Sequence, residues 1–225
     1  MQRRRSLGPD VNGGMPGRGA GFTLLELMVV LAIVGLLALA VAPDMRDWMR
    51  NQNIRNTAQS LQNGLQIARH EAMRRNQPVG FWLVAAGNTQ GAMDDDCQLS
   101  ASSGSWVVSV SDPAGQCASE PSATEAPMVV DKEVAGAASV SVAAVNAGGS
   151  AASSLRFDGY GRIASSSVAS AIARIDIRDS SDASNSGDAT DTFRRLRLLI
   201  SGTGAIHLCD PALSSTGTDP RRCPS

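Results

Sequence analysis

The chain has 225 residues, enough for one membrane segment and one globular domain, and 43% of them are hydrophobic although only 4% are aromatic. Its formal net charge is −1 at pH 7, and the first 21 residues hold four arginines and one acidic residue, so the rest of the chain carries −4. This charge argues against a dedicated nucleic-acid-binding protein, although it leaves room for a local basic patch.

An apolar stretch at residues 22–42 is interrupted only by Thr23 and Glu26. As a helix it would be about 31 Å long, which is the thickness of the hydrocarbon core of a bilayer. Arginines cluster before it and mixed charges follow it, so the positive-inside rule predicts residues 1–21 in the cytoplasm and the rest outside. A carboxylate in lipid is costly unless it is paired, so Glu26 needs a partner that an ordinary signal peptide does not.

Residues 43–77 carry a second helical pattern in which apolar residues recur every three or four positions. The expected buried face consists of Ile54, Ala58, Leu61, Leu65, Ala68 and Ala72. The opposite face is polar, and Gln77 and Pro78 end the pattern. We therefore expect an amphipathic stalk helix whose apolar face packs under a sheet.

Residues 78–225 are expected to form a β-rich globular domain, because short strand-like runs alternate there with turn-rich segments. The predicted strands are 79–85, 105–110, 127–134, 138–145, 154–163, 173–179, 194–200 and 204–209. One long helix followed by a mostly antiparallel sheet is an α+β fold.

The chain has four cysteines, and no two of them form a Cys-x-x-Cys pair. They are Cys97, Cys117, Cys209 and Cys223. An even number at wide spacing favours disulfides in an oxidising compartment over a zinc site. Three connectivities are open, and we expect Cys97–Cys117 and Cys209–Cys223 because each bond closes a short local loop.

Catalytic signatures are missing from the sequence, which has no Gly-x-Ser-x-Gly, no His-Glu-x-x-His and no P-loop. His70 falls on the polar face of the stalk, and His207 falls in a strand. The acidic run 94–96 lacks the spaced oxygen ligands of a calcium loop, and 159–161 is expected to be a turn. We therefore expect no catalysis, no metal and no cofactor, and an anchored periplasmic enzyme is the weaker alternative.

The segment GFTLLELMVVLAIVGLLALAVAP, residues 21–43, resembles the type III signal of type IV pilins and type II secretion pseudopilins. The resemblance implies that a prepilin peptidase cuts after Gly21 and that Phe22 becomes the N-methylated N-terminus. Glu26 then matches the family's glutamate at the fifth mature position and would pair with the new amine of a neighbouring subunit. Gly35 and Pro43 also match the family's pattern. They either make the helix locally flexible for filament packing or are simply residues that membrane helices tolerate.

The order of strands after residue 154 is similar to the GspH/FimT group of minor pseudopilins and minor pilins, and the Cys209–Cys223 tail resembles the FimU/FimT side of that group. This implies a pilin fold and a non-catalytic subunit of a tip or priming complex, in a type IV pilus or a type II secretion pseudopilus. The implied location is the bacterial inner membrane, with a periplasmic C-terminal domain. The implied partners are other minor pilins or pseudopilins, the major subunit, the prepilin peptidase and the inner-membrane assembly platform.

Some FimT-type pilins are thought to bind DNA through a basic Gly-Arg-x-Arg stretch, and the matching residues 204–207 contain no arginine. A DNA-binding minor pilin for natural transformation is nevertheless an alternative, with a substitute patch. That patch would consist of Arg194, Arg195, Arg197, Arg221 and Arg222. A strand with one solvated face explains the same arginines and is favoured.

Overall fold

The computed structural model describes residues 22–86, 92–135, 138–165, 168–181, 193–213 and 218–224, without the side chains of residues 39–44. The chain divides into two compact units, residues 1–43 and 44–225. The leader with Gly21 lies outside the described residues.

Helix α1 (Leu24–Arg75) runs without a break through both predicted helical segments. It ends because Asn76 adopts a left-handed conformation, with φ at 52°, directly before Gln77 and Pro78. The Gln77 N–H donates to the Ala72 carbonyl and the Asn76 N–H donates to the Met73 carbonyl, both at 3.3 Å, which is the Schellman arrangement. In the described part of the chain, no helix reaches the combined length and hydropathy needed to cross a bilayer.

The second half of α1 supplies one wall of the core of residues 44–225. All six residues of the predicted apolar face, from Ile54 to Ala72, are fully buried, so this prediction is confirmed. Gly64 lies on the same side, where a Cβ would come within 2.8 Å of the Phe81 and Trp106 rings. The helix therefore approaches the strands closely at Gly64, and the Trp106 indole N–H donates to the Ser60 hydroxyl at 2.9 Å.

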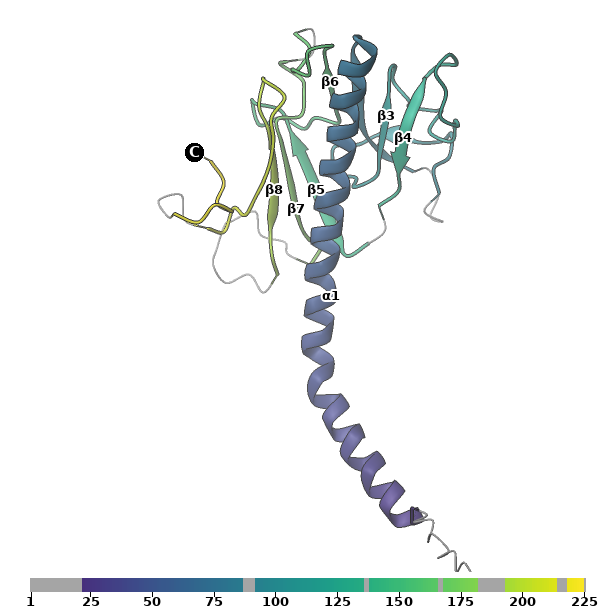
Figure 1. Ribbon diagram of the computed structural model, residues 1–225, viewed down its shortest axis with the longest axis vertical. Helices are drawn as coiled ribbons and strands as arrows, with labels where there is room; N and C mark the ends of the chain where they lie inside the picture. The colour runs from purple at the N-terminus through teal and green to yellow at the C-terminus, as the bar shows by residue number, and fades with distance from the viewer. Residues whose placement is uncertain are drawn as a thin grey trace, which may run out of the picture. The chain divides into compact units, whose positions relative to one another are not determined.

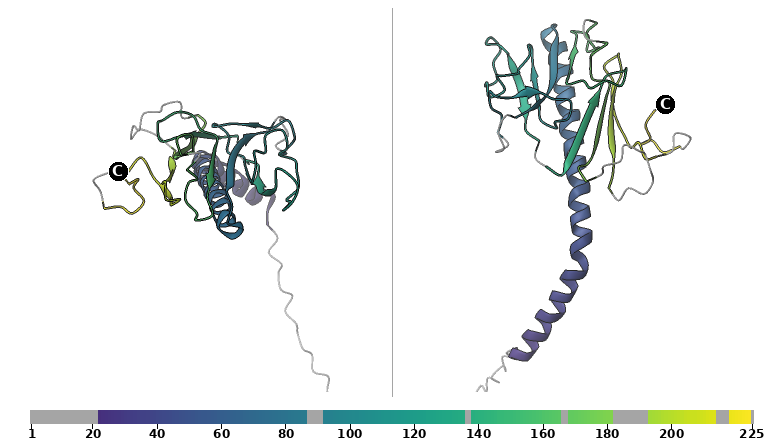
Figure 2. Two further views of the ribbon diagram at one scale, coloured as in Figure 1. Left: turned by 90° about the horizontal axis from the view of Figure 1, so that it is seen from above. Right: turned by 180° about the vertical axis from the view of Figure 1, so that it is seen from behind.

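Two antiparallel sheets pack against this part of α1 (Figure 1), and Figure 2 (left) shows both on one side of the helix. The first sheet contains β1 (Val79–Ala85), β2 (Gln98–Leu99), β3 (Trp106–Ser109), β4 (Val129–Glu133) and β6 (Ser154–Phe157). The second has the order β5-β7-β8-β9, from β5 (Val140–Val145), β7 (Arg174–Asp179), β8 (Leu196–Ile200) and β9 (Ile206–Cys209). One helix followed by antiparallel strands confirms the α+β prediction.

The predicted strand 154–163 is wrong beyond Phe157. Its second half is a turn in which the Asp158 carboxylate accepts the backbone N–H groups of Tyr160 and Arg162, at 2.9 and 3.0 Å. Gly161 adopts φ +74° there, and its carbonyl accepts a hydrogen bond from Arg69 Nε of α1 at 3.0 Å. The expected Gly159–Gly161 turn is thus present, and it ties the strands to the helix.

Candidate functional site

The site begins at the N-terminus of α1, where Thr23 is the cap of the helix. The Glu26 N–H donates to Thr23 Oγ1 at 3.2 Å, and the Leu27 N–H donates to the Thr23 carbonyl at 3.1 Å. Thr-x-x-Glu is the sequence of a capping box, in which the hydroxyl and the acidic residue complete the first turn. Helix α1 therefore begins at Leu24, three residues after Gly21, and Phe22 directly precedes the cap.

Glu26 lies in the first turn and is exposed, as is Phe22 at 85%. A carboxylate in the first turn is favourable because the N-terminus of a helix carries partial positive charge. Both members of the capping box come after Gly21, so removal of residues 1–21 would leave the helix start intact. The exposed carboxylate is open to a cation from outside its own helix.

The apolar side chains that follow are exposed on every side of α1. Each described residue from Phe22 to Ala38 is exposed, including Leu24 at 77% and Leu36 at 70%. Contiguous exposed apolar surface of this kind marks a membrane or protein contact. This half of α1 therefore has no core of its own among the described residues.

Gly35 and Pro43 both lie inside the unbroken helix. A Cβ at Gly35 would meet nothing within 4 Å, so no contact in the structure requires a glycine there. The helical backbone at both positions is compatible with each of the two interpretations left open by the sequence.

Both disulfides have the pairing expected from the sequence. Cys97 and Cys117 are bonded at 1.96 Å and fully buried, and Cys209 and Cys223 are bonded at 2.08 Å. The first bond lies in a small second core on β1, β3 and β4, together with Trp82, Val84, Val107 and Val129. The Lys132 ammonium donates to the carbonyls of residues 117, 118 and 119 at 2.8 to 3.0 Å and holds the bonded loop against β4.

The arginines of the expected basic patch are brought together in part. Arg197 on β8 is the cross-strand neighbour of Cys209, whose disulfide holds the tail beside β9. Arg197 Nε donates to Asp176 at 2.5 Å, so its charge is paired. Arg194 lies just before β8, where its backbone N–H donates to Asn51 Oδ1 at 2.8 Å.

The tail arginines are also engaged. Arg221 donates to both oxygens of Asp219, at 3.1 and 2.7 Å, and this hydrogen bonding lowers the pKa of Asp219 to about 2. Arg222 forms a backbone bridge with Asp210. Because carboxylates neutralise Arg197 and Arg221, the geometry does not favour a DNA patch.

Elsewhere in the part of the chain that the structure describes, ionisable residues build no metal site. In the described ranges, no three His, Cys, Asp or Glu side chains are grouped to hold an ion. His70 and His207 are both exposed, on α1 and β9. Within the acidic run 94–96, Asp95 is exposed and accepts the Ala118 N–H at 3.0 Å.

Two structural features were not predicted from the sequence. The Thr23 cap was signalled by Thr-x-x-Glu but was not interpreted as one. The fully buried Asp179 side chain pairs at 3.0 Å with Arg50, whose guanidinium also lies 5.2 Å from the centre of the Phe193 ring. This contact joins residues 129 positions apart and has no local sequence signal.

Comparisons with known proteins agree with the structure. A family profile described as Type II transport protein GspH matches residues 57–204, and a profile of the Prokaryotic N-terminal methylation motif matches residues 18–42. A capped apolar helix with this motif, continued into an α+β domain, defines a structural pilin-like subunit. The GspH profile covers more than half of the chain, so the chain belongs to the GspH family, as the sequence resemblance predicted.

Two crystal structures of the type IV minor pilin FimU from Pseudomonas aeruginosa (strain PAO1) are similar to the chain. One is 16% identical, covers 72% of this chain and 91% of that chain, and has a TM-score of 0.42. The other is 14% identical, covers 68% and 90%, and has a TM-score of 0.38. No curated protein matches the chain.

Proposed function

We propose that this protein is a non-catalytic subunit of the tip or priming complex of a type IV pilus or a type II secretion pseudopilus. A prepilin peptidase cuts after Gly21, Phe22 is N-methylated, and residues 22–42 hold the subunit in the inner membrane. The stalk and the domain after residue 42 are periplasmic, where the two disulfides form. Assembly then joins it to other minor subunits, the major subunit and the assembly platform.

The observation that carries this proposal is the geometry of Phe22, Thr23 and Glu26. Cleavage after Gly21 would create an amine one residue before the Thr23 cap. A cation there is unfavourable for its own helix, because the first turn already carries partial positive charge. An exposed carboxylate at Glu26 of a neighbouring helix supplies the compensating charge.

Burial strengthens this pairing. Packing the exposed apolar residues 22–38 of adjacent subunits removes water from both charges, so each must find a partner. The Glu26 side chain sits within the same apolar helix and thus fixes the height of one helix against the next. An assembly built this way needs no catalytic group.

Replacement of Gly21 tests the processing step. Gly21→Leu should leave a precursor that retains its leader, because a peptidase pocket that fits glycine excludes a larger side chain. Gly14→Leu, which lies deeper in the leader, is the matched control and should mature normally. Gel mobility and N-terminal sequencing of both variants give the answer, and normal maturation of Gly21→Leu would contradict the assignment.

Replacement of Glu26 tests the assembly step. Glu26→Val should permit membrane insertion and cleavage, because it makes the helix more apolar, yet assembly into filaments should fall to a small fraction of the wild-type level. The neighbouring change Leu27→Val is the control and should assemble. Sheared-filament yield at equal membrane content measures the difference, and wild-type assembly of Glu26→Val would exclude the charge pair.

A further inference from the structure

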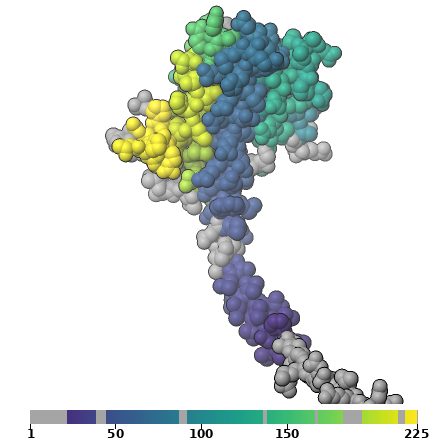
Figure 3. Space-filling view, in the orientation of Figure 1, coloured from purple at the N-terminus to yellow at the C-terminus, as the bar shows by residue number. Residues whose placement is uncertain are grey.

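A hollow of about 300 Å³ lies between α1 and the first sheet, where β3 begins and β4 ends. Four residues of α1 line one side and four residues of the sheet side line the other. They are Asn53, Asn56, Thr57, Ser60, Gly104, Glu133, Val134 and Ala135. Figure 3 shows this half of α1 uncovered beside the teal residues that include β3 and β4. We call this open space the Glu133 hollow.

Small side chains leave the Glu133 hollow open where α1 passes the strands. Gly104 has no side chain, and a Cβ there would lie 3.2 Å from the Ala135 Cβ and 3.4 Å from the Thr57 Cγ2. The sheet side is held in position because the Ala135 N–H donates to Ser105 Oγ at 2.9 Å. The space is therefore a product of the packing between α1 and the strands.

The polar side chains that line the hollow are rich in hydrogen-bond acceptors. One carboxylate and four neutral side chains supply the oxygens, and these residues are Glu133, Asn53, Asn56, Thr57 and Ser60. Among the described residues that line the hollow, none is basic. The hollow thus offers one negative charge and several neutral oxygens to a ligand that is rich in donors.

The exposed carboxylate of Glu133 forms no ion pair within the described part of the chain. Lys132 is its neighbour in β4, but successive residues of a strand point to opposite faces, and three carbonyls of the disulfide-bonded loop hold the Lys132 ammonium. Arg55 lies two positions from both Asn53 and Thr57, so it points away from the flank of α1 that lines the hollow. A cationic ligand would supply the charge that Glu133 lacks.

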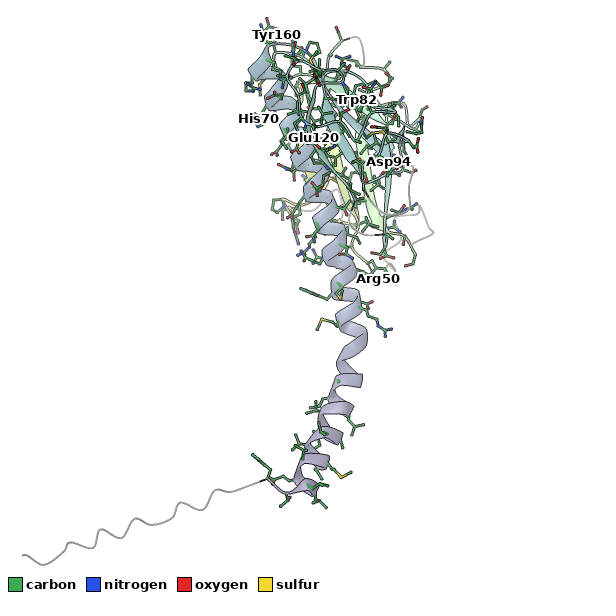
Figure 4. All side chains as sticks on the ribbon, turned by 90° about the vertical axis from the view of Figure 1, so that its right-hand side faces the viewer. Arg50, His70, Trp82, Asp94, Glu120 and Tyr160 are labelled. Carbon is green, nitrogen blue, oxygen red and sulfur yellow. A yellow bond between two sulfur atoms is a disulfide. The ribbon has the colours of Figure 1, made fainter. Side chains whose placement is uncertain are left out.

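The surroundings of the hollow strengthen its preference for a cation. Residues 92–135 contain eight acidic residues and one basic residue, a net charge of −7, whereas the whole chain carries −1. In Figure 4 two of these acidic residues, Asp94 and Glu120, lie apart from Arg50, which pairs with Asp179. A surface of one sign raises the local concentration of ions of the opposite sign. The sheet side of the hollow therefore attracts cations.

We propose that the Glu133 hollow binds the guanidinium group of an arginine side chain that belongs to a protein partner. A guanidinium has five donors and no acceptor, so one carboxylate and several neutral oxygens satisfy it. An ammonium has three donors and is more strongly hydrated, so an open site suits it less well. Sites for small molecules bury most of the ligand, whereas this hollow is open, so the rest of the partner's chain stays outside.

The inference goes beyond the proposed function and can fail independently of it. The hollow lies within residues 44–225 and uses neither the processing site nor Glu26. Binding to the hollow can therefore be measured on the full chain in a neutral detergent, whether or not the leader has been removed.

Trp106 provides a reporter for the hollow. Its indole N–H donates at 2.9 Å to the hydroxyl of Ser60, which lines the hollow. The chain has three tryptophans, so the full chain with isotope-labelled tryptophan gives three indole N–H signals in an NMR spectrum. Trp48→Phe and Trp82→Phe identify the other two signals.

Titration with the peptide acetyl-Gly-Arg-Gly-amide tests the ligand class. The Trp106 signal should shift with a dissociation constant of about 1 to 10 mM, as a single charged contact at an open site allows. The matching citrulline peptide keeps the shape but not the charge, and it should bind at least about tenfold more weakly. Absence of a shift at about 50 mM arginine peptide, or equal binding of the citrulline peptide, overturns the proposal.

Two substitutions test the role of the carboxylate. Glu133→Gln should weaken binding of the arginine peptide about tenfold, whereas Glu125→Gln, which removes an exposed carboxylate outside the hollow, should leave it unchanged. Asn56→Asp adds a second carboxylate that can still accept from Gln52 Nε2, so binding should tighten several-fold. Unchanged binding by either hollow variant overturns the proposal, and the gain at Asn56→Asp is not an effect that loss of folding could produce.

Ethylguanidinium tests whether the ligand comes from a protein. It carries the same charged group without a peptide backbone, so it should bind no more tightly than the arginine peptide. Tighter binding of ethylguanidinium would overturn the assignment to a protein partner.

Discussion

The two halves of α1 share one continuous helix but differ in what covers them. From Phe22 to Ala38 every described side chain is exposed, whereas from Ile54 to Ala72 a complete apolar face is buried under two sheets. The second half is stabilised by its own chain. The first half exposes more apolar surface than water favours, so its partner must come from a bilayer or from other subunits.

Replacing leucine by alanine should give the largest difference between the two halves of α1. Leu61→Ala removes a fully buried side chain and should lower the free energy of unfolding of the domain by about 3 kcal/mol. Leu36→Ala removes a side chain that is 70% exposed and should leave it unchanged. Denaturant unfolding of the full chain in detergent, followed by tryptophan fluorescence, measures both, and similar losses would show that the two halves are not independent.

Replacing the two glycines inside α1 should also affect its two halves differently. Alanine is the better helix former by about 1 kcal/mol, so Gly35→Ala, with nothing within 4 Å of its Cβ, should raise helix content. Gly64→Ala should instead destabilise the domain by about 1 kcal/mol net, because its Cβ would lie 2.8 Å from two buried rings and overpacking outweighs the helical gain. Circular dichroism and denaturant unfolding distinguish the two, and a stabilised Gly64→Ala would contradict the close approach.

The smallest effect concerns acid stability of the second half. Hydrogen bonds from Arg74, together with Arg75, lower the pKa of Glu71 from 4.5 to about 2. The folded state therefore binds this proton less readily than the unfolded state, so the stabilisation is complete above pH 4.5 and is lost as the pH falls toward 2. Glu71→Gln should flatten the dependence of the unfolding midpoint on pH in this range, and an unchanged slope would exclude the pairing.

Local sequence patterns were sufficient to predict α1 but not to predict how the strands form two sheets. The spacing of Ile54, Ala58 and Leu61 predicts the buried face because helical periodicity needs no knowledge of the partner. The division of the strands into two sheets and the short β2 depend on pairings between distant residues. Gly64 and Asp179 show the same limit, because the rings near the first and the arginine bound to the second come from other elements.

The residues of the proposed site come from the sequence, whereas their geometry comes from the structure. A resemblance to known signals places Phe22 and Glu26 beside the proposed processing site. Thr-x-x-Glu signals the Thr23 cap in the sequence, whereas the exposure of Glu26 in the first turn emerges only from the folded structure.

The most direct test of the account is the identity of the N-terminus of the protein isolated from its own membrane. Intact mass measurement with N-terminal sequencing should find an N-methylated Phe22 followed by Thr23, on a chain that stays with the membrane until it enters a filament. Recovery of a chain that still carries its arginine-rich leader, or of one trimmed past Ala42 and free of the membrane, would contradict the account.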